Sequence, residues 1–174
     1  MPDPVTREDE VLLLDLMNST PVVEGEQRDL LAADVTSHAW VRARGGVGSA
    51  AEIAHLRQVR DRLQAVVRGV EAPDALRPFL TGVHLLPEIT QGGLRWSLGV
   101  VDDERLAARV LLAWAHVQES MPGRLRACAN EECRFVFVDR SPTGRRRWCD
   151  MRTCGNQAKV ARHRAKVREG DGPA

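Results

Sequence analysis

The sequence predicts a mainly α-helical (α+β) protein: a helical N-terminal domain with one β-hairpin, followed by a small cysteine-bearing module. Apolar residues recur at helical spacing in several segments of residues 8–121, whereas residues 83–100 alternate with the period of two that is typical of strands. All four cysteines of the 174-residue chain lie between Cys128 and Cys154. A chain of this length can bury a sizeable core in one or two domains.

The first predicted helix covers residues 8–18 and ends before Pro21, because the residue preceding a proline disfavours helical backbone. A second helix is expected over residues 31–44, and the pair Gly45–Gly46 ends it. The apolar surface of the first helix is predicted to consist of Val11, Leu12, Leu14 and Leu16.

The segment Ser49–Glu52 has the spacing of a capping box and predicts the start of an amphipathic helix. Its apolar positions are Ile53, Leu56, Val59, Leu63, Val66, Val67 and Val70. Four arginines are expected mostly on the outward face of this helix: Arg57, Arg60, Arg62 and Arg68.

Beyond this helix, Pro73 favours a further short helix that Pro78 makes irregular. Residues 83–100 then predict a β-hairpin around the glycine turn at Gln91–Gly93. The acids of Asp102–Glu104 are placed where a helix N-terminus favours negative charge, and the helix that they begin ends at Pro122–Gly123.

The cysteines form two pairs of identical spacing, Cys128 with Cys133 and Cys149 with Cys154, separated by fifteen residues. Two local pairs at this separation are typical of a four-thiolate zinc site. Zinc suits four soft thiolates, and a reducing cytosol favours metal binding over disulfides. We therefore predict one structural Zn²⁺ held by these four cysteines.

The surrounding residues predict a treble-clef-like finger. Residues 126–138 are expected to form a hairpin that carries the first cysteine pair, since Phe135 and Phe137 alternate with valines. The second pair leads into a helix ending near Arg168. A narrow stripe on that helix is expected to lie against the hairpin: Ala158, Ala161 and Ala165.

The charge is divided between the two parts. Residues 1–123 carry 12 Arg and 18 acidic residues, a net charge of −6, whereas residues 124–174 carry 13 Lys or Arg and 6 acidic residues, a net charge of +7. A basic zinc-bearing module suits a polyanionic partner, although basic tails are often only solvated. We predict an N-terminal domain over residues 1–121, a four-cysteine zinc finger over residues 124–168 and a disordered tail over residues 169–174.

The final helix and the turn before it supply the candidate contacts to nucleic acid. Four of these side chains share one helix face, because they have the spacing i, i+3, i+4 and i+7: Lys159, Arg162, His163 and Lys166. The candidates are Arg145, Arg146, Arg147, Arg152, Gln157, Lys159, Arg162, His163 and Lys166.

Other functional classes find no support in the residues. The N-terminal domain has no glycine-rich phosphate loop, nucleophile elbow or metal-binding His-Glu pair, so no enzyme is expected. Its histidines are scattered without metal spacing and are expected at the surface or hydrogen-bonded in the core. No segment has the length and apolarity of a membrane span, and no signal-peptide pattern is visible, so a cytoplasmic protein is expected.

The finger resembles the bacterial CGNR zinc finger, named for its Cys-Gly-Asn-Arg signature. The resemblance lies in Leu125–Asn130, Cys133, Arg146–Cys149, Cys154–Asn156 and Ala158–Lys159. The segment Leu12–Thr20 is similar to the Leu-Asp-Phe-x-Asn-Thr opening of the ABATE domain, which usually precedes that finger.

This resemblance implies a stress-related transcription regulator with the same four cysteines as zinc ligands. The signature arginine is Gln157 here, which leaves the metal site intact but removes a charge. Glutamine in DNA contacts favours adenine, whereas arginine favours guanine.

The leading hypothesis is a DNA-binding regulator whose N-terminal domain senses a small-molecule effector or mediates assembly. A zinc-stabilised protein-interaction adaptor that binds no DNA is the second hypothesis. A thiol redox sensor, in which oxidation ejects zinc, is the third, since electropositive surroundings make thiolates more reactive.

Overall fold

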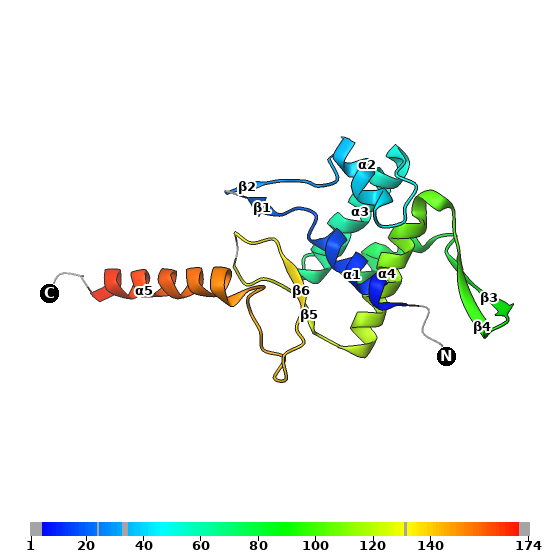
Figure 1. Cartoon of the computed structure of the whole chain (residues 1–174). Coiled ribbons are helices and arrows are strands. Elements are labelled where there is room, and N and C mark those ends of the chain that lie inside the picture. Colours follow the sequence, from blue (N-terminus) through cyan, green and yellow to red (C-terminus); the bar gives the residue numbers. More distant parts are fainter. Residues whose placement is uncertain (1–4, 24, 33–34, 131, 171–174) are drawn as a thin grey trace.

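The computed structural model describes residues 5–23, 25–32, 35–130 and 132–170, with side chains beyond Arg162 described only for Arg164. In this part of the chain the N-terminal body is mainly helical, as predicted (Figure 1). Its helices are α1 (Arg7–Met17), α2 (Val35–Arg42), α3 (Ala50–Val67), the 3₁₀ helix η1 (Pro73–Leu80) and α4 (Asp102–Ser120).

The described strands form three antiparallel pairs. Strand β1 (Val22–Val23) pairs with β2 (Glu26–Gln27), β3 (His84–Thr90) with β4 (Gly93–Gly99), and β5 (Leu125–Ala127) with β6 (Val136–Val138). The described part of the chain closes with a short π-helical turn η2 (Met151–Gly155) and helix α5 (Asn156–Gly170). Helix α5 and the β3–β4 hairpin project from opposite ends of the molecule (Figure 1). No helix among the described residues is long and apolar enough to cross a membrane.

Helix α1 begins with a complete capping box that the sequence analysis does not predict. Thr6 Oγ1 accepts from Asp9 N at 3.3 Å, and Asp9 Oδ2 accepts from Thr6 N at 2.8 Å. The helix therefore starts one residue earlier than expected. Its buried apolar face is shifted too: Val11 is 53% exposed, whereas Leu13 is fully buried.

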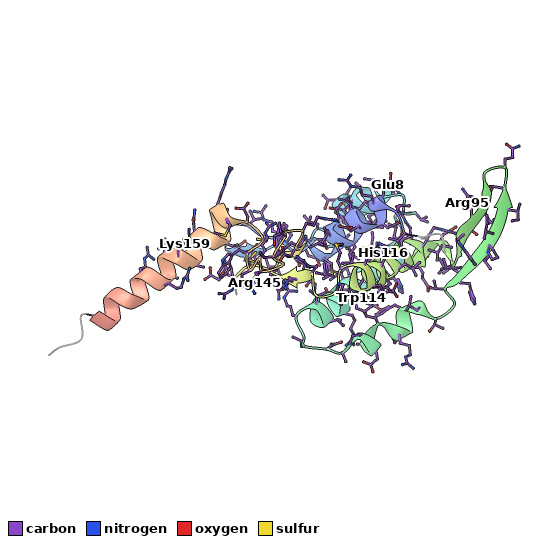
Figure 2. The ribbon with its side chains drawn as sticks, turned by 90° about the horizontal axis from the view of Figure 1, so that it is seen from below. Glu8, Arg95, Trp114, His116, Arg145 and Lys159 are labelled. Atoms are coloured by element: carbon purple, nitrogen blue, oxygen red, sulfur yellow. The ribbon has the colours of Figure 1, made fainter. Side chains whose placement is uncertain are left out.

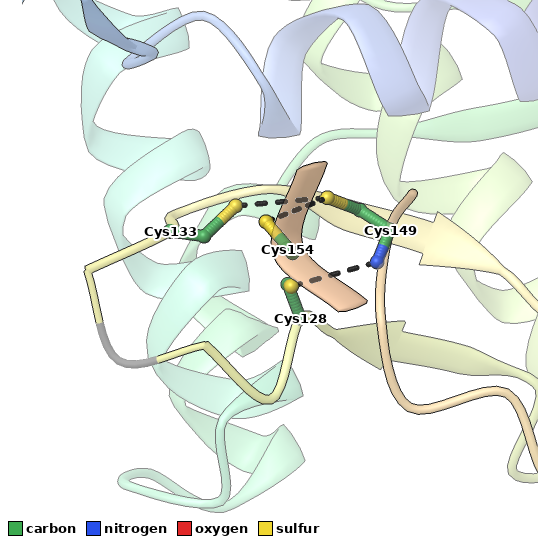
Figure 3. A group of neighbouring side chains, drawn as sticks. All are labelled: Cys128, Cys133, Cys149 and Cys154. Carbon is green, nitrogen blue, oxygen red and sulfur yellow. Dashed lines mark hydrogen bonds between the residues drawn. The ribbon is translucent and has the colours of Figure 1, made fainter. Parts of the chain in front are cut away.

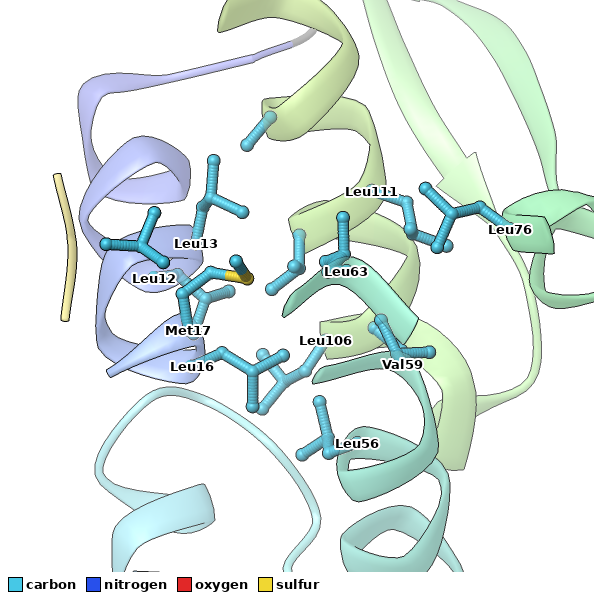
Figure 4. Close-up of a cluster of buried hydrophobic side chains, with 14 of the residues drawn as sticks. Leu12, Leu13, Leu16, Met17, Leu56, Val59, Leu63, Leu76, Leu106 and Leu111 are labelled. Atoms are coloured by element: carbon cyan, nitrogen blue, oxygen red, sulfur yellow. The ribbon is translucent and has the colours of Figure 1, made fainter. Parts of the chain in front are cut away.

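The core lies between α1, α3 and α4, with η1 at one side (Figure 4). The core joins helices that lie far apart in the sequence. Each helix contributes the apolar stripe of its own surface, as an amphipathic helix does. The central side chains are Leu12, Leu13, Leu16, Met17, Leu56, Val59, Leu63, Leu76, Leu106 and Leu111.

Helix α3 starts at the predicted cap, where Ser49 Oγ accepts from Glu52 N at 2.9 Å. The reciprocal half of the expected capping box is absent, because Glu52 Oε2 accepts from Gly48 N instead. The expectation of an outward arginine face is wrong at Arg60, whose side chain is only 3% exposed. Its guanidinium is buried because Asp29, in the segment that follows β2, forms an ion pair with it.

The predicted hairpin of residues 83–100 is confirmed as β3–β4, with Thr90 paired to Gly93 across the Gln91–Gly92 turn. Cross-strand pairing places six side chains of apolar type on one face: Leu85, Pro87, Ile89, Leu94, Trp96 and Leu98. The base of this face packs near α4, but the tip extends beyond the body, where Ile89 is 84% exposed.

The β5–β6 hairpin shares the core of the body. Leu125, Val136 and Val138 belong to the same buried cluster as the α1, α3 and α4 side chains. In addition, Asn18 at the end of α1 binds both backbone groups of Val136: Asn18 Nδ2 donates to the carbonyl at 2.9 Å, and Asn18 Oδ1 accepts from the amide at 2.7 Å. The first part of the finger is therefore joined to the body by packing and by hydrogen bonds.

Candidate zinc centre and nucleic-acid interface

The four cysteines meet at one point, although they come from two separate parts of the finger (Figure 3). Cys128 and Cys133 lie in the loop that joins β5 to β6, as predicted, and Cys154 lies in η2 at the start of α5. All four Sγ atoms lie within 4.8 Å of one another, and all four thiols are free. The donors therefore fit a single metal ion.

The spacing of the sulfurs also fits zinc. Cys149 Sγ lies 3.7 Å from Cys133 Sγ and 3.6 Å from Cys154 Sγ. Tetrahedral zinc with Zn–S bonds of about 2.3 Å separates its sulfurs by about 3.8 Å. Four protein ligands close the coordination shell and leave no position for water or substrate, so the ion is structural.

Metal binding at this centre requires the cysteine thiols to release their protons. Burial raises the pKa of the Cys133 thiol, and burial together with the neighbouring thiols raises the pKa of Cys149. Burial acts in the same direction on Cys154, but hydrogen bonds from Asn130 and the other cysteines outweigh it and lower the pKa. Zinc stabilises the thiolate forms and thereby displaces the protons.

Backbone hydrogen bonds hold the two cysteine pairs together. Cys128 N donates to Phe135 O at 2.8 Å, which closes the loop of the first pair. Ala129 N donates to Arg147 O at 2.8 Å and joins that loop to the segment before the second pair. Cys149 N donates to Cys128 Sγ at 3.5 Å, a contact that stabilises a thiolate.

Asn130 links the metal centre to the position where the signature arginine is replaced. Asn130 Nδ2 donates to Cys154 Sγ at 3.7 Å and to Gln157 Oε1 at 3.1 Å, while its Oδ1 accepts from Glu132 N at 3.2 Å. The Gln157 carbonyl is thus engaged by the zinc loop. In the sequence, Asn130 stands out only as part of the resemblance to the CGNR finger, and this role depends on the folded structure.

Asp150 orients the turn that presents Cys154, and sequence reasoning misses it. Its Oδ1 caps η2 by accepting from Arg152 N at 2.7 Å and Thr153 N at 3.1 Å. These backbone hydrogen bonds lower the pKa of Asp150. The available signal was an aspartate immediately before a helical segment, which is a preferred N-cap residue.

Asp139 closes the arginine-bearing turn that follows β6, and it too was missed. Its buried carboxylate accepts from Ser141 Oγ at 2.6 Å, Ser141 N at 3.0 Å and Arg146 N at 2.9 Å. The Ser141 hydroxyl bond is the largest influence, and together these contacts lower the pKa of Asp139 to about 2. Arg124 Nη1 donates to Ser141 O at 2.7 Å and adds a further contact to this turn.

The predicted arginine candidates divide into two groups. Arg146 is engaged within the finger, since its Nε donates to Trp148 O at 2.8 Å and its guanidinium lies 4.9 Å from the centre of the Phe137 ring. Arg147 lies 5.2 Å from the centre of the Trp148 ring. Arg145 and Arg152 are exposed, and neither lies within ion-pair distance of a carboxylate in the described part of the chain.

Helix α5 carries the remaining candidates away from the body (Figure 2). Lys159 and Arg162 are exposed, and Arg164 adds a third exposed cation. The side chains of His163 and Lys166 lie outside the described side chains. The expected packing of the alanine stripe on the hairpin is wrong at Ala161, which is exposed because α5 points away from β5–β6. Helix α5 runs to Gly170, two residues into the segment predicted to be a disordered tail.

Among the described residues, the four cysteines are the only group of three or more potential ligands close enough to hold a metal ion. The histidines of the body serve local contacts instead: His38 Nδ1 lies 2.7 Å from Gly48 O, and the His55 ring packs edge-on against Phe79.

Comparison with known families covers both parts of the chain. Residues 10–129 match the ABATE family, described as "Putative stress-induced transcription regulator", and residues 124–167 match the CGNR zinc finger. No curated protein matches the chain. The ABATE match covers more than half of the sequence and runs directly into the finger. The chain therefore belongs to the ABATE family and carries a C-terminal CGNR zinc finger with one structural zinc ion.

Proposed function

We propose that the protein is a cytoplasmic bacterial regulator that binds DNA through its finger, while the body senses an effector or mediates assembly. The proposed role is binding and not catalysis. The zinc ion holds the start of α5 in place, and α5 makes the principal contact with the duplex. Arg145 and Arg152 would contact phosphates beside the helix.

The observation that carries this proposal is helix α5, which projects from the body and exposes the cations Lys159, Arg162 and Arg164. Residues 156–170 contain five Lys or Arg and one Glu. An α-helix with side chains is about 10–12 Å across and fits the major groove of B-DNA, which is about 12 Å wide. The charge supplies affinity for the phosphate backbone, whatever the base sequence.

The decisive experiment measures binding of a labelled duplex over a series of salt concentrations. Replacement of Lys159, Arg162 and Lys166 by Ala should abolish binding at moderate salt and reduce the slope of log K against log salt by about 2.7 units, at about 0.9 per lost phosphate contact. Zinc content should remain one per chain, because none of the three residues is a ligand.

Arg95→Ala supplies the matched control, because Arg95 is an exposed cation on the β3–β4 hairpin at the opposite end of the molecule (Figure 2). We expect its affinity to equal that of the wild type. If the triple variant binds the duplex as tightly as the wild type, α5 is not the DNA-binding face. A selection of bound duplexes from random sequence, made with the wild type, identifies the preferred site.

One observation favours the adaptor as the second candidate. The tip of the β3–β4 hairpin exposes the cross-strand pair Ile89 and Leu94, and exposed apolar side chains are common at protein–protein contacts. An adaptor bound through this tip would be insensitive to salt and to the triple substitution, whereas phosphate binding must weaken steeply as salt rises.

A further inference from the structure

An arginine-rich cleft lies where the body, the β1–β2 pair and the finger meet. It has a volume of about 460 Å³ and is lined by side chains of α3, by Gln27 of β2 and by Arg134 of the finger. Four of its lining residues are arginines and two are aspartates: Arg57, Arg60, Arg68, Arg134, Asp29 and Asp61. The lining therefore has a net charge of +2.

The two aspartates are already occupied by the most buried arginine. Arg60 Nη1 and Nη2 donate to the two oxygens of Asp29 at 2.5 and 3.0 Å, and Arg60 Nε donates to Asp61 at 2.9 Å. Arg57 reaches Asp29 only at 3.6 Å. The carboxylates thus neutralise Arg60 and leave little for the other guanidinium groups.

Arg68 and Arg134 have no carboxylate within ion-pair distance among the residues that the structure describes. Arg68 instead donates to two carbonyls, Gln64 O at 3.3 Å and Arg134 O at 2.7 Å, and Arg134 donates to the side chain of Gln27. Burial and the nearby charge of Arg134 lower the pKa of Arg68. Two like charges thus face one concave site, and no described carboxylate pairs with either of them.

We propose that this cleft binds a small dianion with a phosphate group, either inorganic phosphate or a phosphomonoester. Guanidinium groups present several N–H donors in a planar fork that matches phosphate oxygens. The volume lies within the range of small-molecule sites.

The location gives such a ligand a structural consequence. Arg134 directly follows the zinc ligand Cys133, whereas Arg57 and Arg68 belong to or flank α3 of the body. An anion held between them connects the finger loop to the body. This inference does not depend on DNA binding, because none of the cleft arginines belongs to α5.

Calorimetric titration of the zinc-loaded protein with inorganic phosphate tests the site, with glycerol 3-phosphate as the phosphomonoester arm. We expect one saturable site, weakened about tenfold or more in Arg68→Ala and in Arg134→Ala, since a charge-assisted hydrogen bond contributes at least that factor. Arg68→Lys should retain part of the affinity, because it keeps the charge but loses the planar fork of donors. Arg77→Ala, an exposed arginine of η1, is the matched control and should bind as the wild type does.

Thermal unfolding and zinc content identify variants that fold poorly. Arg134→Gln then tests whether the charge of Arg134 binds the anion, because the backbone carbonyl of residue 134 still accepts from Arg68 while the charge is lost. Absence of saturable binding by both anions in the wild type would overturn the proposal. Wild-type affinity for the anions in Arg68→Ala and Arg134→Ala would also overturn it. Loss of duplex binding in these variants, without anion binding in the wild type, would assign the arginines to DNA and overturn it equally.

Discussion

Replacement of Asn18 is the most direct test of how the finger is attached to the body. The substitution Asn18→Ala removes both hydrogen bonds to Val136. It changes no residue of helix α1 and no zinc ligand. Val136 is only 1% exposed, so water cannot easily replace the lost partners. The variant leaves a buried N–H and a buried C=O without a partner in β6.

The expected destabilisation follows from those two groups. Each unsatisfied buried backbone group costs about 1–3 kcal/mol, and partial relaxation brings the expected total to about 2–4 kcal/mol. With a urea m-value of about 2 kcal/mol/M, the unfolding midpoint should fall by about 1–2 M. Helical circular dichroism in urea measures the body, and retained zinc measures the finger.

Asn156→Ala is the matched control, because it also removes an amide hydrogen bond, from Asn156 Nδ2 to Arg152 O at 3.0 Å, but from an exposed residue. Its cost should be below about 0.5 kcal/mol, as for most surface substitutions. If Asn18→Ala unfolds at the same urea concentration as Asn156→Ala, the Asn18 hydrogen bonds do not hold the hairpin to the body.

Two further predictions concern the metal and pH. Cys149→Ser should lose stoichiometric zinc and unfold the finger around residues 139–168, since zinc binding contributes on the order of 10 kcal/mol to folding. The body should keep its helicity. A full equivalent of zinc with an unchanged finger would contradict the ligand assignment. Burial raises the pKa of Glu52, so its proton favours the folded state, and wild-type stability should fall as pH rises through that pKa. Glu52→Gln should show a flatter dependence in thermal unfolding above pH 4.5, and parallel curves for the two proteins would refute the linkage.

Local patterns predicted the zinc centre well. Two cysteine pairs with short, equal spacing suffice to indicate the ligands, because each pair is closed by backbone contacts within its own loop, such as Cys128 N to Phe135 O. The helices were predicted for the same reason: caps and apolar periodicity act over a few residues. The α3 cap at Ser49 and the β3–β4 turn are examples.

The residues that support the centre were harder to predict. Asp139 and Asp150 accept backbone hydrogen bonds whose geometry exists only when the turns have folded. Their residue type alone does not separate them from the many solvated carboxylates of a charged chain. Asn130 likewise acquires its role when α5 brings Gln157 within 3.1 Å.

By itself, therefore, the sequence determined the class of fold, the four zinc ligands and the separation of an acidic body from a basic finger, because spacing, periodicity and charge are local or additive properties. The tertiary structure alone decided that Arg60 is buried with Asp29, that Asn18 binds Val136, and that α5 points into solvent. Arg60 and Asp29 are 31 positions apart in the sequence, and Asn18 and Val136 are 118 positions apart. The third feature depends on the direction in which α5 leaves its turn. No single segment of the sequence encodes such distances.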